Sequence, residues 1–131
     1  LILLGEESGQ IPVRELELSL QESMENLKLC RVPGNMIFQG AGYIDKENAV
    51  RLYDAAEWLL EQVWKTIRAF IITVAIQDNT GYVAFNIDGT PDVLGDAKTV
   101  FMEEFGLPCD IQIQERDIRI RVEVRTGGTE Q

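Results

Sequence analysis

The oxygen-bearing side chains around Gly89 are the first residues whose types and spacing could do chemistry. Asn86, Asp88 and Asp92 flank this glycine, and carboxylate and amide oxygens suit hard cations such as Mg²⁺ and Ca²⁺. A calcium loop of the EF-hand type needs further acids at later positions, which this segment lacks. A turn followed by a helix start explains the same residues, because Thr90-Pro91-Asp92 combines an N-cap, a first-turn proline and an acid. We therefore predict no metal site here.

The glycine loop Gly40-Ala41-Gly42 is the second candidate. It lies between a short apolar triplet and an expected helix, where glycines can let the backbone approach a phosphate. Asp45 occupies the position of the third glycine of such a motif, and its charge repels a phosphate. No parallel strand–helix–strand unit follows. We interpret the loop as a flexible joint and predict no cofactor.

Histidine is absent from all 131 residues, and only two cysteines occur. This removes Ser-His and Cys-His nucleophile pairs and imidazole metal ligands. Cys30 and Cys109 form no CxxC motif; we interpret them as buried thiols of a reducing compartment, with a single disulfide as the alternative. The 22 acidic residues offer many carboxylate pairs but single out none. An enzyme using carboxylates, with or without Mg²⁺, stays the third hypothesis for function.

The net charge of −10 favours a soluble protein and repels polyanions, so we expect no nucleic-acid partner. No segment approaches the roughly 20 apolar residues of a membrane span. The apolar start Leu1–Leu4 lacks the basic region of a signal peptide, although a signal upstream of Leu1 stays open. We expect a cytoplasmic protein with an arm at residues 1–10, one domain at 11–125 and a loose tail at 126–131.

The hydrophobic pattern predicts the elements that must position these residues. Strict alternation in Arg14–Leu20 predicts a half-buried strand, and the spacing of Leu20, Met24 and Leu27 predicts a short helix within residues 21–30. A long helix is predicted over about residues 46–68, with Asp45 as its N-cap. Its apolar residues form two adjacent stripes that cover roughly half of the helix circumference.

Two hairpins follow. The first joins residues 70–76 to 82–87 across the turn Asp78-Asn79-Thr80-Gly81, and the second joins residues 110–114 to 118–125. A helix over residues 91–105 connects them. The predicted fold class is therefore α+β, with a mostly antiparallel sheet of two hairpins plus an N-terminal strand, and one long and one shorter helix packed on one face.

Trp58 is the most informative single residue. It falls on the polar face of the long helix, and tryptophan is enriched at interfaces. The alternative is a tryptophan covered by residues 1–4 or 21–38 of the same chain. We predict Trp58 as an interaction residue that contacts a protein partner or a second copy of the chain.

Arg119, Arg121 and Arg125 form a local basic row on the last predicted strand, with Arg116 at the preceding turn. Arginine binds carboxylates and phosphates in a bidentate way, which predicts a site for an anion or an acidic partner. Pairing with acids across the sheet is the alternative and the favoured explanation, with Glu15 and Glu17 as the expected partners. The last strand, residues 118–125, could pair with another chain as an edge strand, but its arginines are also the kind of charge that blunts such an edge.

These observations favour a non-catalytic protein-interaction or assembly module, able to self-associate into a homo-oligomer. The alternative is a small-ligand-binding or sensor domain. Its pocket would lie between the long helix and the sheet and would be lined by Tyr53, Trp64 and Phe85.

Overall fold

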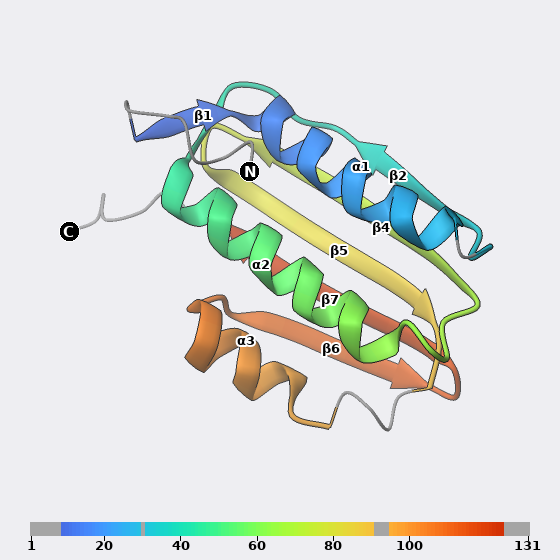
Figure 1. Ribbon diagram of the computed structural model, residues 1–131. Coiled ribbons are helices and arrows are strands. Elements are labelled where there is room, and N and C mark those ends of the chain that lie inside the picture. Colours follow the sequence, from blue (N-terminus) through green and yellow to red (C-terminus); the bar gives the residue numbers. More distant parts are fainter. Residues whose placement is uncertain (1–8, 30, 91–94, 125–131) are drawn as a thin grey trace.

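The computed structural model describes residues 9–29, 31–90 and 95–124. A five-stranded sheet forms one layer, and three helices cover one of its faces (Figure 1). The strands of the sheet, in spatial order, are β2 (Gly34–Phe38), β4 (Ala69–Gln77), β5 (Thr80–Asp88), β7 (Asp117–Val124) and β6 (Cys109–Gln114). The helices are α1 (Val13–Leu29), α2 (Lys46–Val63) and α3 (Ala97–Phe105), and a small antiparallel pair joins β1 (Gln10–Pro12) to β3 (Tyr43–Asp45).

The sheet is mixed, because β2 runs parallel to β4 whereas the other neighbouring strands are antiparallel. Both predicted hairpins are present, as β4–β5 and β6–β7. The predicted fold class is nevertheless wrong. It lacked the parallel pair, counted two helices instead of three, and added an N-terminal strand that is not part of the sheet.

That N-terminal strand is the main error, since residues Arg14–Leu20 belong to α1. Leu16 and Leu20 are buried and four residues apart, as on one face of a helix, while Leu18 between them is 41% exposed. The alternation over seven residues fits both a strand and a helix. The longer repeat of Val13, Leu16, Leu20 and Met24, all buried, fits only a helix.

The turn between β4 and β5 formed as its residue types indicate. Asp78 and Asn79 both have positive φ, 50° and 67°, which matches the primed turns that suit two-residue hairpins. The Asn79 side chain also holds the start of α2, because it accepts from the Asp45 backbone N–H at 2.7 Å and donates to the Asp45 carboxylate at 3.1 Å. The hairpin thereby positions the long helix.

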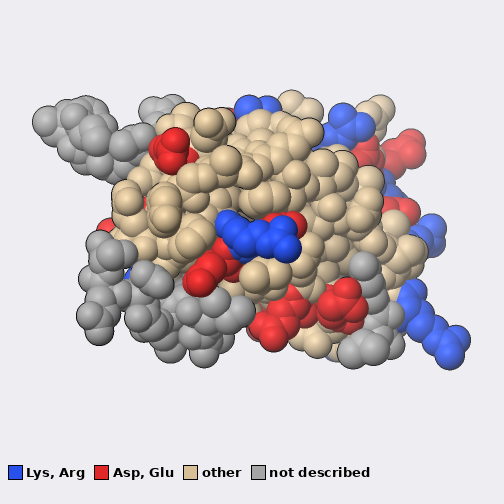
Figure 2. Space-filling view, turned by 90° about the horizontal axis from the view of Figure 1, so that it is seen from above, with Lys and Arg blue, Asp and Glu red and all other residues tan. Residues whose placement is uncertain are grey.

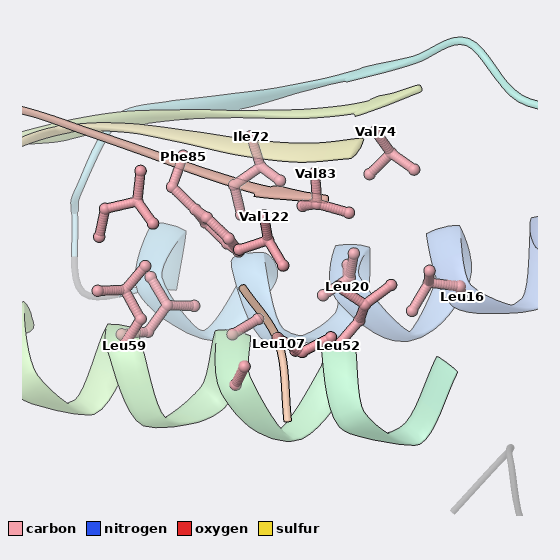
Figure 3. Close-up of a cluster of buried hydrophobic side chains, with 14 of the residues drawn as sticks. Leu16, Leu20, Leu52, Leu59, Ile72, Val74, Val83, Phe85, Leu107 and Val122 are labelled. Carbon is pink, nitrogen blue, oxygen red and sulfur yellow. The ribbon is translucent and has the colours of Figure 1, made fainter. Parts of the chain in front are cut away.

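The core lies between the helices and the sheet. In Figure 3 the side chains of β4, β5 and β7 point toward leucines of α1 and α2. Its largest fully buried members include Phe85, Leu16, Leu59, Ile72 and Ile120. Helix α2 ends at Val63, five residues before the predicted end, whereas α3 ends as predicted at Gly106, which has a left-handed φ of 66°.

Strand β7 is not an edge, contrary to the prediction, because it lies between β5 and β6. The edges of the sheet are β2 and β6. Among residues 9–29, 31–90 and 95–124, no helix is both long and apolar enough to cross a membrane.

Candidate functional site

Three chain segments meet at the carboxyl end of β5. The strand ends at Asp88, whose carbonyl accepts from the Arg68 N–H at 2.7 Å, and the Gly89 N–H donates to the Arg116 carbonyl at 3.1 Å. The Thr90 N–H donates to the Thr66 hydroxyl at 3.1 Å. The segment that follows α2, the end of β5 and the β6–β7 turn are therefore joined by two backbone hydrogen bonds and by one to the Thr66 hydroxyl.

Arg116 is the central side chain of this junction. Its Nε donates to the Asp88 carboxylate at 2.8 Å, and its Nη2 donates to the Thr66 carbonyl at 2.9 Å. Thr66 lies just beyond the last residue of α2, where a cation is favoured because the helix dipole has its negative end there. One guanidinium thus links the helix to two parts of the sheet.

A surface hollow of ≈ 420 Å³ lies beside this junction. Its lining contains three acids and one arginine; the lining residues are Asp88, Gln114, Glu115, Arg116 and Asp117. Since Arg116 is already paired with Asp88, the hollow favours a hydrogen-bond donor or a cation over a free anion. On the helix-facing side of the same strand, Phe85 and Ile87 are buried apolar residues.

Trp58 was predicted to lie on the polar face of the long helix, but its side chain is not fully exposed there. It is partly buried against the core, and its ring meets Phe101 of α3 edge to face, with centroids 5.9 Å apart. This contact comes from α3; of the two proposed covers, residues 1–4 lie outside the described residues. The role of Trp58 in binding a partner stays a prediction.

The arginine row is paired along its own strand. Arg119 contacts Asp117 at 3.0 Å and Arg121 contacts Glu123 at 2.9 Å, and the Arg121 guanidinium also stacks on Tyr82, 3.8 Å from the ring centroid. The expected partners Glu15 and Glu17 lie on α1 instead. Arg125 lies outside the described residues. An anion site on this row stays a prediction.

The three residues of the predicted ligand pocket differ in their surroundings, and the pocket stays a prediction. Phe85 is a core residue, Trp64 is 49% exposed at the end of α2, and Tyr53 faces α1, where Ser23 donates to it at 3.5 Å. The Ser23 hydrogen bond lowers the pKa of Tyr53, but burial and the charge of Glu57 outweigh it and leave that pKa above its ordinary value.

Of the remaining chemical candidates, Asp92 lies outside the described residues, and the interpretations of the Gly89 segment and of the glycine loop stay predictions. In the part of the chain that the structure describes, no group of three His, Cys, Asp or Glu residues could hold a metal ion. In the glycine loop, the Ala41 N–H donates to Ile76 and the Ala41 carbonyl accepts from Asp78. Cys109 is a free, partly buried thiol, and burial raises its pKa; Cys30 lies outside the described residues.

Comparison with known proteins gives no match in sequence but clear matches in fold. No protein-family model matches the sequence, and no curated protein is a significant match. Several solved structures match over nearly the whole chain. The catalytic domain of histidine kinase ThkA, in a nucleotide-free form, has a TM-score of 0.64 at 10% identity, and the match covers 92% of this chain and 97% of that one.

Two other solved structures agree with it. The cytoplasmic segment of histidine kinase QseC matches with a TM-score of 0.60 at 11% identity, covering 92% of this chain and 79% of that one. A bacterial phosphotransferase matches with a TM-score of 0.57 at 15% identity, covering 93% and 68%. The chain thus has the fold of histidine kinase catalytic domains. This likeness contradicts the hypothesis of a non-catalytic assembly module.

The junction of Thr66, Asp88 and Arg116 is the feature that sequence reasoning missed. Each residue stood beside a recognised turn or helix end, and Asp88 was explained as part of a turn. Residues 66, 88 and 116 are far apart in sequence, so no local period links them. The sequence did contain one indication of these positions. Each of the three residues follows or interrupts a segment with a clear hydrophobic period.

Proposed function

We propose that this chain is a kinase-type nucleotide-binding domain that serves phosphoryl transfer. The observation that carries the proposal is the extent of the fold match, which spans 92% of this chain and 97% of a histidine kinase catalytic domain. Fold likeness alone does not assign an activity, so the proposal depends on the chemistry available at the carboxyl end of β5.

That chemistry suits the base of a nucleotide better than its phosphates. The Asp88 carboxylate is an acceptor for a purine amino group, which is a hydrogen-bond donor. Gly89 follows it with no side chain to obstruct a planar ring. Because the chain carries a net charge of −10, a triphosphate would bring its own Mg²⁺, held through phosphate oxygens and one or two carboxylates.

The phosphoryl acceptor must be sought elsewhere. The sequence has no histidine, so a transfer to histidine would use a histidine of another segment or another protein. The partner that we propose is therefore a histidine-bearing protein segment. By analogy with the QseC cytoplasmic segment, we place the domain in the cytoplasm.

The test is a calorimetric titration of the protein with ATP in the presence of Mg²⁺. We expect saturable binding that Asp88→Asn weakens roughly ten- to a hundredfold, because one charge-assisted hydrogen bond is worth roughly 1.5–3 kcal/mol. Asp110→Asn is the matched control, since Asp110 is exposed on β6 and lies outside the hollow. Absence of heat and of competition by ADP up to millimolar concentrations would overturn the proposal.

A second candidate is a phosphotransferase-type domain that works without a nucleotide of its own. The observation in its favour is that Arg116 already occupies the Asp88 carboxylate, while the helix-facing residues Phe85 and Ile87 offer no polar atom. The bacterial phosphotransferase shares the fold. If ATP binds neither the natural protein nor the folded Arg116→Ala variant, this second candidate is favoured.

A further inference from the structure

In the part of the chain that the structure describes, no strand pairs with the outer side of β2, and its outward backbone groups are identified by its bonds to β4. The Phe70 N–H donates to the Pro33 carbonyl at 3.2 Å, and the Gln39 N–H donates to the Val74 carbonyl at 2.8 Å. Residues of a parallel strand alternate in the side to which their backbone groups point. The backbone N–H and C=O groups of the odd-numbered residues of this segment therefore point toward β4. Those of the even-numbered residues point away from the sheet, in its plane. The even-numbered residues are Gly34, Met36 and Phe38.

One outward donor already has a substitute partner. The Met36 N–H donates to the Asn35 side-chain oxygen at 2.9 Å, which stands where the carbonyl of an added strand would stand. Side chains that satisfy edge groups are one means by which proteins protect an edge from unwanted pairing. The Asn35 side chain can rotate away, and the Met36 N–H is then available to an added strand.

A hollow of ≈ 520 Å³ lies beside this edge, between α1 and β2, and its lining has an apolar part and an acidic part. The lining residues are Leu18, Gln21, Glu22, Met24, Glu25, Asn35 and Met36. Leu18 and Met36 make an adaptable apolar surface of the kind used for binding varied side chains, with the buried Met24 beneath it. Glu22 and Glu25 complete the lining among the residues whose side chains the structure describes, and that part of the lining holds no basic residue.

The surroundings of the hollow agree with this division. Helix α1 lies over β2 at the top of the molecule in Figure 1. Seen from above, much of this side is uncharged, with a basic side chain beside acidic ones near its centre, further acidic side chains toward its lower margin and further basic ones along its upper and right margins (Figure 2). Long Lys and Arg side chains match such a surface, because their stems cover apolar groups while their charged ends reach carboxylates.

We propose that the β2 edge and this hollow bind an extended segment of another protein, rich in aliphatic and Lys or Arg residues, as a sixth strand of the sheet. Backbone hydrogen bonds to an edge strand supply affinity in this mode, and alternate side chains supply specificity. A foreign basic segment is favoured over a second copy of the chain, because each copy carries a net charge of −10. This surface is separate from the nucleotide site that we propose at the end of β5.

The first experiment measures fluorescence anisotropy of a labelled peptide of alternating Lys and Val, about ten residues long. Alternating Glu and Val at the same length is the control peptide. We expect saturable binding of the Lys peptide only. Glu22→Lys with Glu25→Lys should abolish it, whereas Glu103→Lys with Glu104→Lys on α3 changes the net charge equally and should weaken it only slightly.

The second experiment separates edge pairing from simple charge attraction. Met36→Pro removes an outward N–H without removing a bond to β4, a position that tolerates proline, and Met36→Ala removes the side chain but keeps the N–H. We expect Met36→Pro to bind the Lys peptide about three- to tenfold more weakly than Met36→Ala, the worth of one hydrogen bond. Asn35→Ala should tighten binding, since it frees the Met36 N–H.

Three results would overturn the inference. Equal affinities of folded Met36→Pro and Met36→Ala would show that the edge is not used. Equal effects of the α1 and α3 charge reversals would show non-specific attraction. A dimer in light scattering that the peptide dissociates would assign the edge to a second copy instead. None of these results bears on ATP binding, which Asp88→Asn tests separately.

Discussion

The two faces of the sheet are built from the same alternating strands, yet they have different environments. On the helix-facing side, Ile72, Phe85 and Ile120 are buried to 2% exposure or less. On the other side, Ile71 is 41% exposed, and Arg119 and Arg121 pair with acids of their own strand. The comparison teaches that coverage by helices, rather than the composition of a strand, decides which residues carry the stability of the fold.

Truncation on each face gives the largest contrast. Phe85→Ala should lower the free energy of unfolding by about 3–5 kcal/mol, because it leaves a cavity in a closely packed core. Ile71→Ala, on the open face, should change it by less than about 1 kcal/mol. Urea denaturation followed by circular dichroism measures both. Similar losses for the two variants would contradict the view that the helix-covered face carries most of the stability.

The helical state of the first segment is tested next. Leu18→Pro should cost about 3 kcal/mol of unfolding free energy, since proline in a helix interior removes a hydrogen bond and clashes with the preceding turn. Leu18→Ala serves as the control and should stay near the natural protein, because the Leu18 side chain is exposed and alanine favours a helix. A tolerated proline would contradict the assignment of Arg14–Leu20 to α1.

The two arginine environments should differ by a smaller amount. Arg116→Ala should lower the free energy of unfolding by about 1 kcal/mol, since Arg116 joins the end of α2 to β5 through two charge-assisted hydrogen bonds. Arg119→Ala should cost less than about 0.5 kcal/mol, because it removes one exposed ion pair. Thermal melts of both variants at low and high salt provide the measurement. A larger loss for Arg119→Ala would reverse the ranking.

The smallest expected effect concerns Cys109, whose register with Val122 places it on the helix-facing side. Burial raises the pKa of this thiol, and the thiolate is the reactive form. The rate of alkylation by iodoacetamide, measured in a Cys30→Ser background, should therefore rise with pH at a midpoint above that of an ordinary thiol. In denaturant the midpoint should fall to the ordinary value. An unshifted midpoint in the folded protein would contradict the placement of Cys109 on the helix-facing side of the sheet.

Sequence reasoning succeeded where local patterns are long or chemically specific. The β4–β5 hairpin follows from its Asp78-Asn79 turn, and the end of α3 follows from Gly106. It failed at Arg14–Leu20, where seven residues fit the period of a strand and that of a helix equally well. It also failed at β7, because the neighbours of a strand depend on how all strands of the sheet are ordered. At the candidate site it identified Asp88 as a turn residue but not its pairing with Arg116.

The acidic charge, the absence of histidine, the long helix and both hairpins follow from the amino-acid sequence alone, because they depend on composition and on contacts between near neighbours. The parallel pairing of β2 with β4, the packing of α3 against Trp58 and the meeting of Thr66, Asp88 and Arg116 become visible in the folded structure. These features join residues distant in the chain, and their energies arise when surfaces are buried together, which no local period records.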